Sequence, residues 1–218
     1  MVRNIFLKLT LAVVLFMVAF IGCKKDGGSG TGPLLGKDDE AFIKYENKFL
    51  DNFWKLNPDW ATSAGYHKYD SLMVLPNEQS RDKLVTFAKY QVDSLSRFEV
   101  NTLSEANKID YKILQNQLEY LQWQVRQLKQ YEWDPSSYNV IGTFAYILNE
   151  HYEPLPKRLR HFYQRMSFIP QYYKDAQKQI KNPVVELTSL AIEQNLGGLD
   201  VIGKDFADSL KKTNIPNA

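Results

Sequence analysis

Apolar residues recur at three- and four-residue spacings over most of the chain after residue 38, which is the period of an amphipathic helix. The pattern begins behind acidic residues that suit a helix N-terminus, and it predicts a helix over 38–57. Pro58 then fits the first position of a short helix, with Asn57 as its cap and Gly65 at its end. The apolar positions of the first helix are Phe42, Tyr45, Phe49, Phe53 and Leu56.

The same period predicts six further helices. They cover 78–98, a stretch from the capping box Thr102–Glu105 to a break at Trp133, 138–149, 155–181 with a bend near Pro170, 184–195, and a segment after Gly197-Gly198 toward Leu210. The buried line of the long helix is predicted to be Ile109, Ile113 or Leu114, Leu118, Leu121, Val125 and Leu128.

No segment alternates with a two-residue period between turn signals, so no sheet is predicted. The predicted fold is therefore all-α, with antiparallel helices joined by short connections, and no fixed-length repeat indicates a solenoid. The tryptophans are predicted to lie in the core rather than to form a ligand platform, and they are Trp54, Trp60, Trp123 and Trp133.

The N-terminus follows a different pattern, because residues 9–21 are apolar apart from Thr10. Two cations precede this run, and Gly22 and the only cysteine, Cys23, follow it, which is the order of a secretory signal. A run of this length is too short to cross ~30 Å of hydrocarbon as a helix. The residues 20–23, Phe-Ile-Gly-Cys, resemble a bacterial lipobox.

The lipobox resemblance implies that the signal, 1–22, is cut before Cys23 and that Cys23 carries lipid, palmitate included. Several acyl chains give durable attachment to a membrane, so we expect a protein of the bacterial envelope that faces outside the cytoplasm. The alternative is an inert cysteine buried at the end of an apolar helix. Residues 23–37 are rich in glycine and predict a flexible tether, and 38–218 predict the helical domain.

Composition limits the possible partners. Of the 218 residues 44% are hydrophobic, enough for a core of one domain or for part of a larger one. Lys and Arg number 27 against 25 Asp and Glu, and the excess lies ahead of the apolar run, at Arg3 and Lys8. The body of the chain is neutral, so no nucleic-acid partner is expected. The sequence predicts no oligomeric state.

Candidate chemistry concentrates in residues 149–165. His151 and His161 lie ten residues apart with two prolines between them, whereas a zincin helix places its histidines four apart. His151 and Glu153 resemble the start of a zinc deaminase motif, which also needs two later cysteines that the sequence lacks. The sequence also contains neither a glycine-rich phosphate loop nor a nucleophile elbow.

The same stretch carries four basic residues, and they predict a solvated helix face, with contact to anionic lipid as the alternative. These residues are Lys157, Arg158, Arg160 and Arg165.

Four segments together resemble the bacterial domain-of-unknown-function 885 (DUF885) family, over residue 38 to the C-terminus. The opening signature is Pro58, Ala61, Thr62 and Gly65, followed by His67 and Tyr69-Asp70. The later segments are Asp110-Tyr111 with Leu114, the turn in 131–138, and Arg165 with Ile169, Pro170 and Tyr172.

The family resemblance implies a mostly helical protein, longer than this chain, that is similar to zinc metallopeptidases with a His-Glu-x-x-Pro-Gly-His type motif in the C-terminal half. This sequence lacks that motif, so we expect the N-terminal helical part, a truncated product or a fragment, inactive alone as a peptidase. No metal ligand is expected in this chain, and zinc is expected only with the missing half. The alternative is a self-sufficient, non-catalytic lipoprotein that binds peptides or other envelope components.

Within the opening signature, Pro58, Ala61, Thr62 and Gly65 are expected to be structural: a helix start, close packing and a helix stop. His67 and Tyr69 follow on a polar loop, where binding groups are often held, and are the candidates for lining a cleft that accepts peptide. For His67 the alternative is a capped histidine exposed to solvent.

Overall fold

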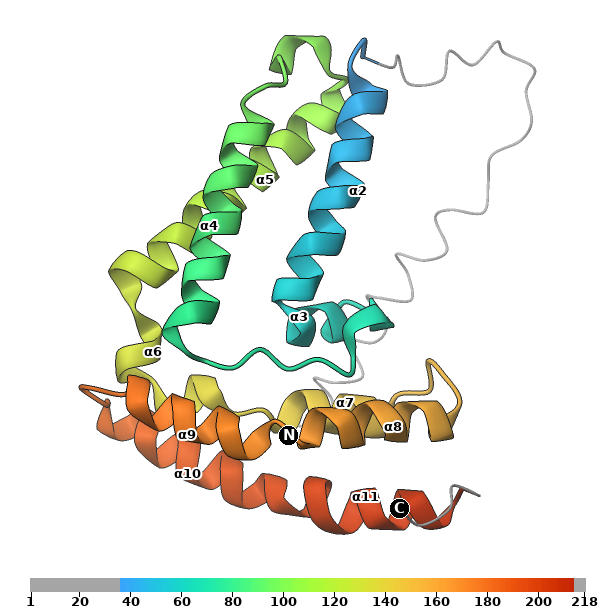
Figure 1. The fold of residues 1–218 in the computed structure, drawn as a ribbon, viewed down its shortest axis with the longest axis vertical. Helices are drawn as coiled ribbons and strands as arrows, with labels where there is room; N and C mark the ends of the chain where they lie inside the picture. The colour runs from blue at the N-terminus through green and yellow to red at the C-terminus, as the bar shows by residue number, and fades with distance from the viewer. Residues whose placement is uncertain (1–35, 214–218) are drawn as a thin grey trace, which may run out of the picture. The chain divides into compact units, whose positions relative to one another are not determined.

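The computed structural model describes residues 36–213, and it contains helices and no strand over that range, so the predicted all-α fold is confirmed (Figure 1). The predicted signal 1–22, Cys23 and nearly all of the tether lie outside the described residues. The α-helices are α2 Asp39–Leu56, α3 Pro58–Ser63, α4 Glu78–Leu95, α5 Glu105–Trp123, α6 Gln130–Trp133, α7 Ile141–Asn149, α8 Leu155–Met166, α9 Ile169–Gln179, α10 Val185–Asp200 and α11 Phe206–Lys211. Short 3-10 or π-helical segments are η2 His67–Tyr69, η3 Val100–Thr102, η4 Gln124–Leu128, η5 Pro135–Tyr138 and η6 Val201–Asp205.

Helices α2, α4 and α5 lie side by side and enclose the first core (Figure 1). We call this core the aromatic cluster, because rings from α2 pack in its centre. Phe42 meets Phe98 edge-on at 5.2 Å between ring centroids, and Phe49 stacks on Phe53 at 5.7 Å. Its buried members are Phe42, Phe49, Phe53, Ala88, Leu95, Leu103, Leu114, Leu118 and Leu121.

Helices α7 and α8 form a second core together with α11, and we call it the α7–α8 cluster. Phe162 lies at its centre, edge-on to Phe144 at 4.8 Å and stacked on Phe206 at 4.4 Å. The buried members are Met73, Val140, Phe144, Ile147, Leu148, Leu159, Phe162 and Phe206. Met73 lies in the segment between η2 and α4, so residues from the first half of the chain enter the second core.

The predicted buried line of α5 is wrong at its start. Ile109 and Ile113 are 60% and 59% exposed, whereas Leu114, Leu118 and Leu121 are buried. Periodicity allowed either Ile113 or Leu114, and packing against α2 and α4 selects the face that carries the leucines.

Both ends of α5 also differ from the prediction. Ser104, not Thr102, is the cap, and its hydroxyl accepts from the Asn107 N–H at 3.5 Å. The Thr102 hydroxyl donates instead to Asp38 Oδ2 at 2.5 Å. At the other end α5 passes into η4, and Lys129, with a φ of 49°, ends the helical run before Trp133.

Two glycines do not end a helix as predicted. α10 continues through Gly197 and Gly198. Gly198 serves packing instead of termination, since it lies directly against the Ile141 side chain, where a Cβ would collide. The segment 155–181 contains two helices rather than one bent helix. Pro170 takes the second position of α9, where its missing N–H breaks no helical hydrogen bond.

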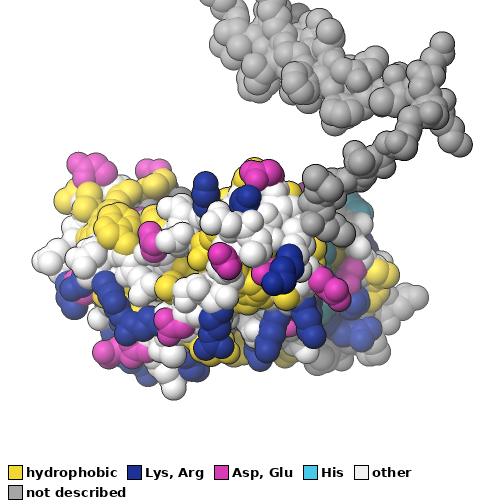
Figure 2. Space-filling model, turned by 90° about the horizontal axis from the view of Figure 1, so that it is seen from above, with side chains coloured by type: hydrophobic (Ala, Val, Ile, Leu, Met, Phe, Trp, Pro, Cys, Tyr) yellow, Lys and Arg dark blue, Asp and Glu magenta, His cyan; other side chains and the backbone are white. Residues whose placement is uncertain are grey.

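The surface is mixed in character. Trp60 and Trp123 are 48% and 46% exposed, so their predicted place in the core is wrong. On the face shown in Figure 2, charged side chains of both signs lie among apolar ones. None of the helices described between residues 36 and 213 has the length and apolarity needed to cross a bilayer.

Candidate functional site

The loop after α3 folds the opening signature back on itself. Gly65 has a φ of 80°, a region that glycine enters without a steric cost. Its N–H donates to Thr62 O at 3.0 Å, and the Tyr66 N–H donates to Ala61 O at 2.8 Å, which satisfies the last carbonyls of α3. The chain then passes through η2 and brings Asp70 against Thr62.

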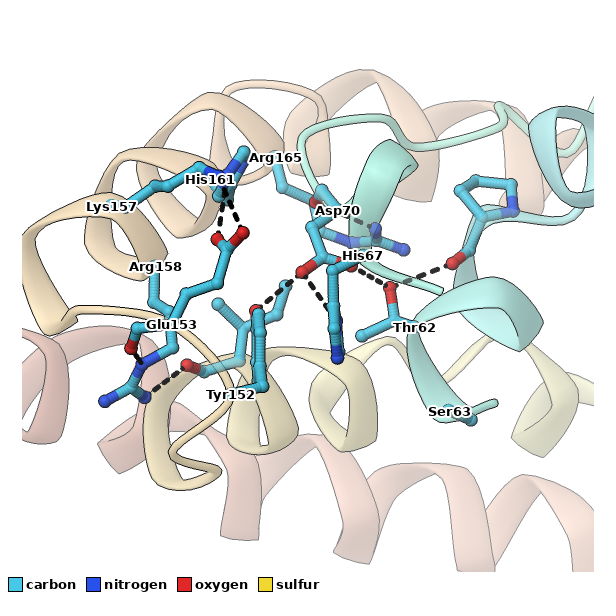
Figure 3. A network of polar contacts seen from close by, with 12 residues as sticks. Thr62, Ser63, His67, Asp70, Tyr152, Glu153, Lys157, Arg158, His161 and Arg165 are labelled. Carbon is cyan, nitrogen blue, oxygen red and sulfur yellow. Dashed lines mark hydrogen bonds and ion pairs between the residues drawn. The ribbon is translucent and has the colours of Figure 1, made fainter. Parts of the chain in front are cut away.

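Asp70 is fully buried and is the acceptor at the centre of a polar network (Figure 3). Its Oδ1 lies 2.7 Å from the Thr62 hydroxyl, and its Oδ2 accepts from the Tyr152 hydroxyl at 2.6 Å. His67 Nδ1 lies 3.1 Å from the same Oδ2. Three donors from α3, η2 and the loop before α8 therefore meet one carboxylate.

Arg165 joins this loop to α8 from the other side, and its side chain is also fully buried. One terminal nitrogen donates to Leu72 O at 2.6 Å and to Asp70 O at 3.2 Å. The other forms an ion pair with Asp59, which also accepts from the Thr143 hydroxyl at 2.7 Å. We call Asp59, Thr62, His67, Asp70, Tyr152 and Arg165 the Arg165 network.

Burial and the nearby carboxylates shift the pKa of Arg165 in opposite directions. Burial lowers the pKa of Arg165, and the carboxylates of Asp59 and Asp70 counteract that shift. Burial, followed by the hydrogen bond to Asp70, raises the pKa of the Tyr152 hydroxyl. The tyrosine therefore stays protonated and remains a donor to Asp70 at neutral pH.

The predicted solvated face of α8 is wrong for two of its four cations. Arg158 and Arg165 are 3% and 0% exposed, because they lie at helical spacing with Leu159 and Phe162 on the buried side of α8. Arg158 Nη1 donates to the carbonyls of Ile147 and Leu148, both at 2.8 Å, near the end of α7. Long guanidinium side chains can satisfy such carbonyls where an apolar residue would leave them unpaired.

His67 is held in one orientation. Its ring stacks on Tyr152 with centroids 3.4 Å apart and planes 8° apart, and its side chain is 17% exposed. An ionised Asp70 can only accept, so Nδ1 carries the proton that is donated to it. Nε2 forms no hydrogen bond with the described residues and is not among the buried unpaired atoms. The ring thus offers a free Nε2 at the surface.

Tyr69 points to a different contact. Its hydroxyl donates to Asp51 Oδ1 on α2 at 3.0 Å, and the same oxygen accepts from Tyr66 at 2.8 Å and from Lys68 at 2.6 Å. These donors lower the pKa of Asp51 to about 2, the hydrogen bond from Lys68 contributing most. The two predicted cleft residues therefore lie on separate hydrogen-bond networks, one centred on Asp70 and one on Asp51.

The other two histidines do not come together. His151 is exposed, while His161 packs against Glu153 with Nε2 and Oε2 3.8 Å apart. Within residues 36–213 no three His, Cys, Asp or Glu side chains are grouped closely enough to hold a metal ion.

A shallow pocket of about 240 Å³ opens between the starts of α3 and α4. It is smaller than most pockets that enclose a small-molecule ligand. Trp60 and Arg81 line it together with Asp59, the member of the Arg165 network that forms the ion pair with Arg165. His67 is not among its lining residues.

The sequence pointed to several residues of the Arg165 network but did not predict that they contact one another. Asp70 and Arg165 stand in two segments of the family resemblance, about a hundred residues apart, yet no spacing rule joins them. Tyr152 carried no sequence signal at all. The best available signal was Arg165 itself, a cation in register with Leu159 and Phe162 on an apolar helix face.

These observations define an all-α protein in which a buried arginine and aspartate tie a signature loop to a later helix. Residues 58–217 match the model of the family described as bacterial protein of unknown function (DUF885), and the chain belongs to that family. The matched range contains every member of the Arg165 network.

The chain is also similar to a solved structure described as "a putative lipoprotein of unknown function from Shewanella oneidensis". The two are 38% identical with a TM-score of 0.78, over 81% of this chain and 32% of that chain. This chain therefore spans about a third of the length of that protein. No curated protein matches the sequence.

Proposed function

We propose that the chain is a lipid-anchored protein of the bacterial cell envelope, attached through Cys23, and that it forms the N-terminal helical part of a larger DUF885 protein. The lipobox-like residues 20–23 and the lipoprotein description of the Shewanella protein support the anchor. The share of that protein that the match covers, 32%, supports a larger whole.

We further propose that this helical part contributes to peptide binding through His67. The observation that carries this proposal is the Asp70–His67 pair, which fixes the imidazole and leaves Nε2 open (Figure 3). A carboxylate that orients the ring gives Nε2 a lone pair that can accept from a peptide N–H or take a proton. Tyr69 stays a predicted lining residue, with its hydroxyl on Asp51.

The family resemblance implies zinc and peptidase chemistry, and we assign both to the part of the larger protein beyond this chain. The described residues do not fit a zinc ion, because no three potential ligands among them lie together. The proposed role of His67 therefore involves no metal. His67 binds and orients peptide.

The anchor is tested by mass spectrometry of the protein purified from cells fed with labelled palmitate. We expect Cys23 as the first residue, carrying acyl chains, and a Cys23→Ser variant that keeps its leader and takes up no label. An unmodified Cys23 behind an intact leader would refute the anchor.

The role of His67 is tested in the larger protein, with the C-terminal part restored, by titrating peptides of mixed sequence. We expect His67→Ala to weaken peptide binding by ~10-fold, the effect of losing a charge-assisted or oriented hydrogen bond. His151→Ala is the matched control, because that histidine is exposed and is not among the side chains that bond to Asp70. Equal affinities in wild type and His67→Ala remove His67 from the site, provided that both unfold at the same temperature.

The second candidate function is a self-sufficient binding module. It is favoured by the two core clusters, which residues 36–213 build without any further chain. Cooperative unfolding of the full chain alone, without binding of an apolar dye, would support this function. Dye binding by the folded chain would support the larger-protein proposal.

A further inference from the structure

Helix α10 exposes large apolar side chains along one line of its surface. Val185, Ile192, Leu196 and Leu199 are 75%, 57%, 64% and 64% exposed. Their spacings of seven, four and three residues put them on one face of the helix. We call these four residues the α10 stripe.

The side of α10 that packs against the protein carries small residues instead of large apolar ones. Ala191 and Gly198 are the buried residues there, and Gly198 allows Ile141 to approach the helix backbone. Asn195 anchors the same side by accepting from the Tyr173 hydroxyl at 2.5 Å. Small residues face the protein and large apolar ones face outward, which reverses the usual order for a surface helix.

An acidic line runs beside the α10 stripe. Glu186, Glu193 and Asp200 are exposed, lie seven residues apart, and form no ion pair within residues 36–213. An apolar stripe flanked by a line of one charge is the pattern with which one helix packs against another of opposite flanking charge. Anionic lipid would be repelled by this line, and so would a second copy that brought the same acidic residues alongside.

The Shewanella protein is much longer than the part that it shares with this chain. Two thirds of its length lie outside the match to this chain, and the shared part has the same fold. In Figure 1, α10 lies at the edge of the described helices, with its outer side away from α7 and α9. We propose that the α10 stripe is the docking face for a helix of the remaining two thirds of the family protein, and that this helix carries apolar residues flanked by Lys or Arg.

This inference rests on the larger-protein part of the proposed function. The experiment uses the full chain, produced in bacteria together with a polypeptide comprising the part of the Shewanella protein outside the match. A photo-crosslinking amino acid is placed at Leu196 or, as the control, at Gln194, which lies roughly 200° around the same helix. We expect a cross-link to the added polypeptide from position 196 and none from position 194.

Variants measure the strength of the contact in the same cells. Leu196→Glu should reduce the co-purified polypeptide by at least ~10-fold, and Gln194→Glu by less than ~2-fold, since only the first places a charge in an apolar contact. Glu193→Lys should also reduce it, because it reverses the sign of the acidic line. All three positions are exposed, so the circular dichroism spectrum should not change.

Three outcomes would overturn the proposal. They are the absence of any complex, a complex that tolerates Leu196→Glu, and a cross-link from position 196 to a second copy of this chain. The anchor and His67 experiments do not involve α10. A failure here with acylated Cys23 and a sensitive His67 therefore removes the docking face alone, whereas a failure of those tests with the cross-link intact removes the proposed anchor or peptide site.

Discussion

The aromatic cluster and the Arg165 network hold two regions of the same chain together by different means. In the first, rings and leucines from α2, α4 and α5 pack without a buried charge among the cluster's members. In the second, a fully buried arginine and a fully buried aspartate bind backbone and side chains from four segments. Apolar contacts are non-directional and numerous, whereas each polar contact needs its own partner in place.

The Arg165 network demands a more exact geometry than the aromatic cluster does. Burying a guanidinium costs free energy through desolvation, and only well-placed partners offset it. Asp59, Asp70 and Arg165 all lie within residues 58–217, which match the family. We therefore expect the region that presents His67 to depend on the geometry of each partner in the network, and the aromatic cluster to tolerate changes that keep its volume.

The largest effect is expected in the aromatic cluster from loss of volume. Phe42→Ala should lower the free energy of unfolding by about 4 kcal/mol, since a fully buried ring leaves a cavity. Leu118→Met, which keeps the volume at another fully buried position, should cost less than about 1.5 kcal/mol. Urea unfolding followed by circular dichroism measures both, and a similar cost for the two would contradict a volume-tolerant cluster.

Substitutions of Arg165 test whether the Arg165 network depends on geometry as well as on charge. We expect that a positive charge alone at this position does not restore stability. Arg165→Met should cost about 3 kcal/mol, since it leaves the Asp70 and Leu72 carbonyls without this donor and removes the cation that pairs with Asp59. Arg165→Lys should still cost about 2 kcal/mol, because an ammonium lacks the fork that reaches several acceptors at once. Arg160→Ala is the exposed control on the same helix and should stay within about 0.5 kcal/mol. A fully stable Arg165→Lys protein would show that the network needs charge and not geometry.

A smaller loss is expected from a single donor of the network. Tyr152→Phe keeps the ring that stacks on His67 but removes the hydroxyl that donates to Asp70, so about 1 kcal/mol should be lost. Tyr146→Phe is the control, because that ring also faces His67 while its hydroxyl forms no hydrogen bond with the described residues. Thermal unfolding of the two variants measures the difference, which should vanish if Asp70 finds water in place of the tyrosine.

The smallest effect concerns charge on the surface of the aromatic region. Burial, and then the nearby carboxylate of Asp110, raise the pKa of Glu46 from 4.5 to about 7. The folded state therefore holds a proton that the unfolded state releases, so stability is greatest below pH 4.5 and falls as the pH rises toward 7. After allowance for solvent screening the loss is less than about 1 kcal/mol.

Glu46→Gln tests this pH dependence. The variant should be more stable than the wild type at pH 7.5 and equal to it at pH 4, and Asp110→Asn should act in the same direction. Glu119→Gln on the exposed side of α5 is the control and should leave the pH profile unchanged. A profile that the Glu46 variant shares with the wild type would show that Glu46 titrates normally in the folded protein.

Local sequence signals predicted the helices better than their buried faces. Pro58 and Gly65 mark the two ends of α3 because a fixed φ and a positive φ act over a few residues. Asn57 takes the N-cap position, but its side-chain amide makes no capping hydrogen bond and donates to Phe53 O at 2.9 Å instead. The same reasoning failed at Ile109 and Gly198, because a period cannot select between adjacent faces and a glycine can serve packing as well as termination.

The sequence by itself determined the helical class, the helix boundaries near Asn57, Pro58 and Gly65, and the family, because these depend on periodicity, on local backbone chemistry and on the order of motifs. Only the tertiary structure decided that Arg165 is buried, that it joins Asp59 to the backbone of Asp70, and that Tyr152 completes the carboxylate holding His67. These contacts join residues about 80 to 105 positions apart. The burial of a charge depends on partners that only the folded chain brings within hydrogen-bond distance.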